Sequence, residues 1–227
     1  MRIYYKIYIM PYFKNNKINL LFIHIPKTGG SSLEIYFSKK YNITLDSNSL
    51  HGEFSLNLKN KIDVIATPQH ILFKTMMKYK NEFNIDTNNL KIITIVRNPY
   101  YRLVSDLFHF KLININSNKK YVYDVILQYL GRYVYDNHSI PQYLFLFDEN
   151  NEIRKDITIF HTETLKNDMI DYGFKDFNLN ENKNKNKNKN KNIDYMNYLN
   201  DNSIALINKH YYNDFKYFNY EMLPCNN

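Results

Sequence analysis

The segment that most constrains the fold is residues 20–37, LLFIHIPKTGGSSLEIYF. Its apolar first part predicts a buried strand over residues 18–25. Gly29 and Gly30 then permit a tight turn. Ser31 or Ser32 can cap the helix whose apolar residues follow. A strand that feeds a helix through a glycine turn is typical of an α/β domain.

The rest of the chain repeats this alternation. Further strands are predicted over residues 63–67, 91–96 and 156–160. Helices are predicted over residues 71–80, 100–112, 162–169, 195–199 and 203–220. Strands that alternate with helices imply a central, mostly parallel sheet covered by helices on both faces. A chain of 227 residues, 44% of them apolar, is most simply one domain that spans residues 1–227.

Residues 181–192 alternate asparagine and lysine almost strictly. Such a run cannot bury apolar surface, so we expect a disordered surface loop there. The run also carries part of the net charge of +8. The remaining positive charge suits an anionic ligand. A repeat expansion in a tolerant loop is a better explanation of the run than a role in attracting substrate.

The loop after the first strand has the composition of an anion site. Backbone N–H groups around Gly29 and Gly30, with the start of the helix, form a positive concavity. Lys27 adds a full charge, and three hydroxyls can donate hydrogen bonds, those of Thr28, Ser31 and Ser32. The lysine precedes the glycines, so the GxxxxGK[ST] order of an ATP-binding loop is absent.

A second motif, IVRNPYYRLVSDLF, begins where the strand over residues 91–96 ends. Arg97 leaves that strand end, where a guanidinium can grip an anion bidentately. Ser105 follows along the helix and can reach the same ligand. Arg102 is either a further ligand contact or part of a structural ion pair. Both motifs lie at carboxyl ends of strands, where α/β sheets bind ligands, so a ligand with two phosphate-like ends is expected.

These two motifs resemble those of the carbohydrate sulfotransferases. FIHIPKTGGSSLE looks like the loop that holds the 5′-phosphosulfate of 3′-phosphoadenosine 5′-phosphosulfate (PAPS), and IVRNPYYRLVSDLF is similar to the element that binds the 3′-phosphate. The resemblance is closest to the heparan and uronyl 2-O-sulfotransferase branch. It implies a sulfotransferase fold like that of P-loop NTPases, transfer of a sulfuryl group to a carbohydrate hydroxyl, the product PAP and no metal. Carried over, Lys27 would neutralise the oxygen that bridges phosphate and sulfate.

A base must take the proton of the acceptor hydroxyl. His70 is the first candidate, because it follows the predicted second strand and because an imidazole titrates near neutrality. Glu34 and Glu53 are weaker candidates. Three other histidines are taken as structural, namely His51, His109 and His161, while Gln142 could touch the substrate.

Other functions fit the same residues. A nucleotide or small-molecule kinase of the same general fold is one, and a degenerate relative that only binds nucleotide or glycan is another. Nucleic-acid binding is disfavoured, because many basic residues lie in the asparagine–lysine run and no recognised motif is present. Cys225 is the only cysteine, and Lys6 and Pro11 interrupt the apolar start of the chain. We therefore expect an enzyme without a stable membrane anchor, in the cytoplasm rather than in a Golgi-type lumen.

Overall fold

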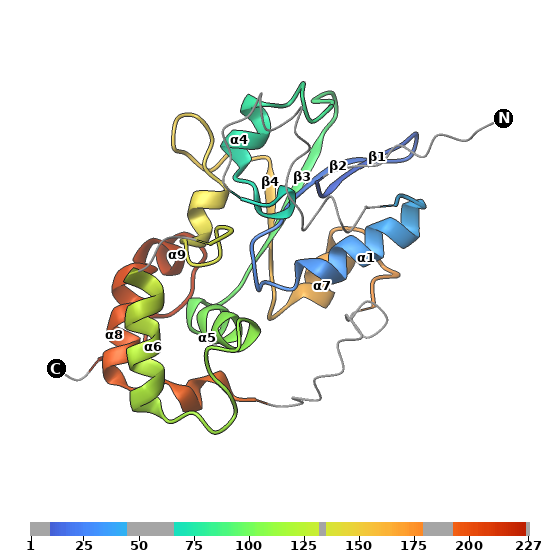
Figure 1. The fold of residues 1–227 in the computed structure, drawn as a ribbon. Helices are drawn as coiled ribbons and strands as arrows, with labels where there is room; N and C mark the ends of the chain where they lie inside the picture. Colours follow the sequence, from blue (N-terminus) through green and yellow to red (C-terminus); the bar gives the residue numbers. More distant parts are fainter. Residues whose placement is uncertain (1–9, 45–65, 132–134, 179–192, 226–227) are drawn as a thin grey trace.

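The apolar runs of the chain form a four-stranded sheet in the computed structural model, which describes residues 10–44, 66–131, 135–178 and 193–225. The strands are β1 (Tyr12–Lys14), β2 (Asn19–Ile23), β3 (Lys91–Val96) and β4 (Ile157–His161), in the spatial order β1-β2-β3-β4 (Figure 1). β1 runs antiparallel to β2, and the other three strands are parallel. β2 and β3 are buried along nearly their whole length, as expected for parallel strands with both faces covered.

The register of the parallel strands sets where the loops meet. Ile23 pairs with Thr94 in β3, and Val96 pairs with His161 in β4. The carboxyl ends of β2, β3 and β4 therefore lie at one edge of the sheet. The loops that leave these ends are the two motif loops and the turn after β4.

Helices surround the sheet (Figure 1). They are α1 (Gly30–Tyr41), α4 (Phe73–Lys78), α5 (Pro99–His109), α6 (Lys119–Gly131), α7 (Leu165–Asp171), α8 (Asp201–His210) and α9 (Tyr212–Tyr217), with the short 3₁₀ helices η1 (Pro68–His70), η2 (Gln142–Phe145) and η3 (Tyr195–Tyr198). α1 and α7 lie on one side, and α5, α6, α8 and α9 gather on the other. None of the described helices is long and apolar enough to cross a bilayer.

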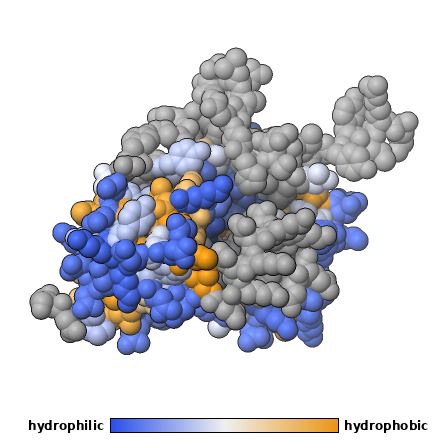
Figure 2. Space-filling view, turned by 60° about the horizontal axis from the view of Figure 1, so that its bottom comes forward, coloured by the Kyte–Doolittle hydropathy of each residue, from blue (hydrophilic) through white to orange (hydrophobic). Residues whose placement is uncertain are grey.

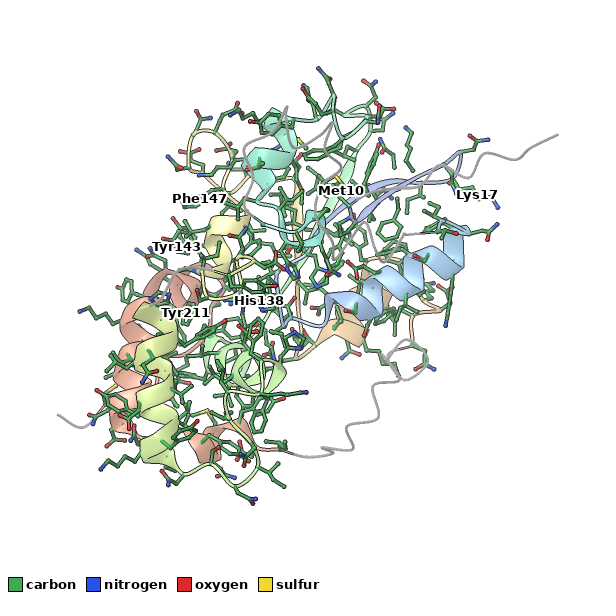
Figure 3. All side chains as sticks on the ribbon, in the orientation of Figure 1. Met10, Lys17, His138, Tyr143, Phe147 and Tyr211 are labelled. Carbon is green, nitrogen blue, oxygen red and sulfur yellow. The ribbon has the colours of Figure 1, made fainter. Side chains whose placement is uncertain are left out.

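The apolar side chains form two clusters. Figure 3 draws the described side chains on the ribbon. One joins the sheet to α1, α4 and α7, and it includes the fully buried Phe22 and Phe37. The other is made by α5, α6, α8 and α9, and it includes Leu107 and Ile126. Polar residues cover most of the described surface on the face seen in Figure 2, with apolar residues in scattered patches.

The structure confirms the α/β class and three of the predicted strands within one or two residues of their ends. The predicted strand over residues 63–67 is wrong where it can be checked: residues 63–65 lie outside the described part, and Ala66 and Thr67 are not in a strand. Thr67 is instead the N-cap of η1, and its N–H and hydroxyl donate to Asp136. Residues 181–192 lie outside the described residues. β1 and α6 were not predicted.

Candidate active site

The loop between β2 and α1 turns sharply because two of its residues adopt left-handed backbone angles. Lys27 has φ 65° and Gly29 has φ 93°. Gly29 is the N-cap of α1, and no side chain caps that helix. The Ser32 N–H binds the Gly29 carbonyl at 3.0 Å, whereas the first N–H groups of a helix have no carbonyl within the helix to bind. The helix start can therefore receive an anion.

Three side chains donate to the carbonyl groups of this loop, one from the end of β3, one from the end of β4 and one from α5. Arg102 Nε donates to the carbonyl of residue 26 at 3.1 Å, and Arg97 Nη1 donates to that of residue 27 at 3.1 Å. The Thr162 hydroxyl donates to the carbonyl of residue 28 at 2.6 Å. Because the donors follow β3 and β4, the loop is fixed relative to both neighbouring strands.

A histidine packs directly against Gly30, the second glycine of this motif. A Cβ atom on Gly30 would lie 2.4 Å from His24 Nε2, so only glycine fits at this position. His24 Nδ1 binds the Glu34 carboxylate at 2.7 Å, and the Gln69 amide donates to the same carboxylate at 2.8 and 2.9 Å. Burial by itself would raise the pKa of Glu34, but the interactions with His24 and Gln69 outweigh it and hold that pKa below its usual value.

The loop borders a cavity of about 600 Å³. Four parts of the chain line it: the loop after β2 with the start of α1, η1 with the residue before it, the segment from Arg97 through α5 to Phe110, and the loop over residues 135–138. These parts are far apart in the sequence. A cavity of this size suits a small-molecule or nucleotide ligand.

One side of the cavity is cationic, because Lys27 and Arg97 both line it. Burial lowers the pKa of Lys27, the Asp106 carboxylate opposes this shift, and Arg97 adds to it. The Gln142 side chain accepts from the Arg97 N–H at 2.9 Å and donates to its carbonyl at 2.8 Å. The Arg97 guanidinium lies over the ring of Tyr195, 5.4 Å from its centre. Gln142 therefore holds the backbone of Arg97, and Tyr195 contacts its guanidinium.

The other side carries a buried histidine–aspartate pair. His70 Nδ1 lies 2.7 Å from Asp136 Oδ2, and the Asp136 carboxylate also accepts from the Thr67 N–H and hydroxyl. Burial lowers the pKa of His70 to about 4, so the ring is neutral at pH 7. An ionised Asp136 keeps the proton on Nδ1, which leaves the lone pair on Nε2. That is the state a general base requires.

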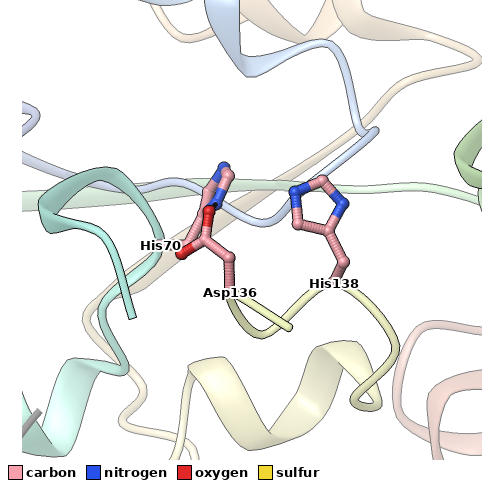
Figure 4. A group of neighbouring side chains, drawn as sticks. All are labelled: His70, Asp136 and His138. Atoms are coloured by element: carbon pink, nitrogen blue, oxygen red, sulfur yellow. Dashed lines mark hydrogen bonds and ion pairs between the residues drawn. The ribbon is translucent and has the colours of Figure 1, made fainter. Parts of the chain in front are cut away.

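A second histidine–aspartate pair lies beside the first, and Figure 4 shows its histidine, His138, next to His70. His138 Nδ1 is 2.7 Å from Asp106 Oδ1, and the Tyr129 hydroxyl also donates to Asp106. The rings of His138 and His70 lie edge to face with their centres 5.0 Å apart. One ring nitrogen of each histidine and a carboxylate oxygen of Asp136 lie within 4.8 Å of one another. Metals can use these ligand types, but three protein hydrogen bonds already occupy Asp136.

The structure brings most of the predicted site residues together. Those that line the cavity are Lys27, Gly29, Gly30, Ser31, His70, Arg97 and Ser105. Thr28 and Ser32 are not among the lining residues. The Thr28 hydroxyl is buried and donates to the Ile25 carbonyl at 2.8 Å. Its cofactor contact and that of Ser32 stay predictions.

Other candidates have structural partners. Arg102 is buried and donates to three backbone carbonyls, those of Pro26, His138 and Ile140, so it acts as a brace rather than in an ion pair. The amide of Gln142 is bound to the Arg97 backbone, and Glu34 is bound to His24 and Gln69.

Among the remaining histidines, His109 lines the cavity, although the sequence suggested a purely structural role. His161 is half-buried at the end of β4, does not line the cavity, and lies 3.3 Å from the Phe218 carbonyl. His51 and Glu53 lie outside the described residues. Sequence reasoning missed Asp136, His138 and Asp106, because nothing local in the chain connects them to His70.

Comparison with known proteins gives one match. A family model described as the sulfotransferase family matches residues 10–221, nearly the whole chain. No curated protein and no solved structure matches it.

Proposed function

The chain belongs to the sulfotransferase family, and from this premise we propose that it moves the sulfuryl group of PAPS to a carbohydrate hydroxyl, with His70 as the base. One observation carries the proposal. A cationic anion-binding loop and a neutral, carboxylate-bound histidine face the same cavity. A donor and an acceptor can therefore meet between Lys27 and His70.

The cationic side fits a donor with two anionic ends. Lys27 and the N–H groups at the start of α1 would hold the 5′-phosphosulfate. Arg97 and Ser105, on the neighbouring strand end and helix, would hold the 3′-phosphate. PAPS supplies an activated sulfuryl group when bound.

Residues of the chain then accept the proton of the acceptor hydroxyl and stabilise the charge on the leaving group. As the acceptor oxygen bonds to sulfur, the bond between sulfur and the bridging oxygen breaks, and the bridging oxygen leaves with PAP. His70 Nε2 takes the acceptor's proton, and Asp136 stabilises the imidazolium that forms. Lys27 neutralises the charge that develops on the bridging oxygen. Positioning and charge stabilisation dominate such a transfer, as they do in phosphoryl transfer.

A thermal-shift comparison tests the proposal. We expect PAP to raise the melting temperature because it binds only the folded protein, while ATP–Mg and AMP shift it less. His70→Ala should keep the PAP shift and lose transfer of labelled sulfate to a panel of glycans. Stabilisation by ATP–Mg without any by PAP would instead favour a kinase. PAP binding without transfer to any glycan would identify a non-catalytic relative.

A further inference from the structure

Arg97, which the proposed function places on the 3′-phosphate, directly follows the last residue of β3. One side chain binds both polar groups of its backbone. Gln142 Oε1 accepts from the Arg97 N–H at 2.9 Å, and Gln142 Nε2 donates to the Arg97 carbonyl at 2.8 Å. A primary amide offers a donor and an acceptor side by side, as a peptide group does. Gln142 therefore takes the place of a backbone partner at the point where β3 ends.

A buried carboxylate on α9 fixes Gln142 in turn. Asp214 Oδ2 accepts from the Gln142 N–H at 2.8 Å, and Oδ1 accepts from the Tyr143 N–H at 2.9 Å. Gln142 and Asp214 are both completely buried. A carboxylate at such a depth requires donors, and these two N–H groups bind it to the start of η2. The position of the Gln142 amide thus depends on Asp214.

Gln142 acts behind the cavity rather than inside it. The sequence suggested that this residue could touch the substrate, but it is not among the residues that line the cavity, whereas Arg97 is. The Arg97 guanidinium has two further contacts, the Lys27 carbonyl at 3.1 Å and the ring of Tyr195. Because a guanidinium can bind a phosphate through two parallel hydrogen bonds, a small shift of the arginine backbone would weaken both of them.

We propose that Gln142 and Asp214 are positioning residues of the donor site: Asp214 orients Gln142, Gln142 sets the place of Arg97, and Arg97 binds the 3′-phosphate. This inference rests on the proposed function. It concerns one end of the donor. In the described part of the chain, the hydrogen bonds of Gln142 and Asp214 reach Arg97 and Tyr143, and not Lys27 or the start of α1, which would hold the 5′-phosphosulfate.

Two ligands separate the two ends of the donor. PAP carries both phosphates and AMP carries only the 5′-phosphate, so the ratio of their dissociation constants, measured by isothermal titration calorimetry, reports the 3′-phosphate contact. Gln142→Met keeps the length of the side chain and removes the amide. It should weaken PAP binding about tenfold, as expected for the loss of about one hydrogen bond to a charged group. AMP binding should change by less than about twofold.

Asp214→Asn keeps the shape of the side chain but puts a donor in place of one acceptor oxygen, so it should lower the preference for PAP in the same direction. It decides the question if Gln142→Met fails to show a cooperative unfolding transition in urea. Asp148→Asn is the matched control. Asp148 also accepts from two backbone N–H groups, those of Asn150 and Glu152, in a loop that does not line the cavity. This variant should keep the full preference for PAP.

The possible failures are distinguishable. If the folded variants keep the full preference for PAP, or if they lose affinity for PAP and AMP equally, Gln142 and Asp214 do not position Arg97 for the 3′-phosphate and the inference is wrong. If the unchanged protein binds AMP as tightly as PAP, Arg97 does not hold the 3′-phosphate, and the inference is also wrong. Absence of any PAP binding by the unchanged protein would overturn the proposed function itself.

Discussion

At the scale of single residues, the site depends on buried carboxylates that are each bound by an imidazole. The three pairs are His24–Glu34, His70–Asp136 and His138–Asp106. An unpaired carboxylate at these depths would cost several kcal/mol. Each pairing removes that cost and also fixes the tautomer of the histidine.

Stability should depend on pH through His70. In the unfolded chain its pKa is about 6.5, whereas burial lowers it to about 4 in the folded protein. Between these values the unfolded state binds more protons, so the free energy of unfolding should fall as pH drops from about 6.5 to 4. Urea denaturation across this range should show a steeper fall for the unchanged protein than for His70→Gln.

The comparison with His70→Gln separates His70 from other groups. His109 and His210 also have pKa values lowered mainly by burial, but both remain in the variant. Identical slopes for the two proteins would contradict a neutral, buried His70.

Position 30 requires a glycine because the His24 ring leaves no room for a Cβ atom, and not because the backbone there adopts a positive φ. Gly30→Ala would place its Cβ 2.4 Å from His24 Nε2, and the hydrogen bond to Glu34 holds that ring in place. We expect a loss of about 1–3 kcal/mol in the free energy of unfolding from this overpacking, measured by urea denaturation.

Gly131 provides the matched control, because a Cβ there meets no atom within 4 Å. Gly131→Ala in α6 should be neutral or stabilise by up to about 1 kcal/mol. Equal effects at the two glycines would show that His24 moves aside at little cost.

At the scale of elements, the strand–loop–helix units were predictable because their signals are local. The apolar run of β3 is followed by Asn98, which caps α5 by accepting from the Tyr100 N–H at 3.0 Å, and by Pro99 at the helix start. α6 was missed because its many aromatic and β-branched residues weaken the helical pattern. At Ala66 and Thr67, the part of the strand expected before His70 that the structure describes, the prediction is wrong, because Thr67 precedes η1 and donates to a distant aspartate.

Arg102 braces two of these elements against each other, since its guanidinium binds the loop after β2 and residues 138 and 140. Arg102→Lys loses the fork of donors and leaves buried carbonyls without partners. The free energy of unfolding should fall by about 3 kcal/mol. Arg154→Lys, which alters an exposed pair with Asp156, should change it by less than about 0.5 kcal/mol. Similar losses in both variants would contradict the bracing role.

At the scale of the whole molecule, the sequence predicts the fold class and the cationic side of the cavity far better than the histidine side. Lys27, Gly29 and Gly30 lie within one short motif, and the parallel strand order brings Arg97 beside them. Asp136 is separated from His70 by 66 residues. Only the packing of the helical cluster against the sheet brings them together, and no single-sequence pattern encodes that distance.

The same division has a consequence for how such a chain could diversify. Lys27 and Arg97, on the cationic side, follow the ends of two adjacent strands. The residues of the histidine side lie in segments that connect the strands, residues 67–70 and 135–138. Connections tolerate replacement better than the strands they join. Grafting these two connections from a relative should exchange acceptor preference as a unit and leave nucleotide affinity unchanged, so donor and acceptor recognition behave as separately exchangeable modules.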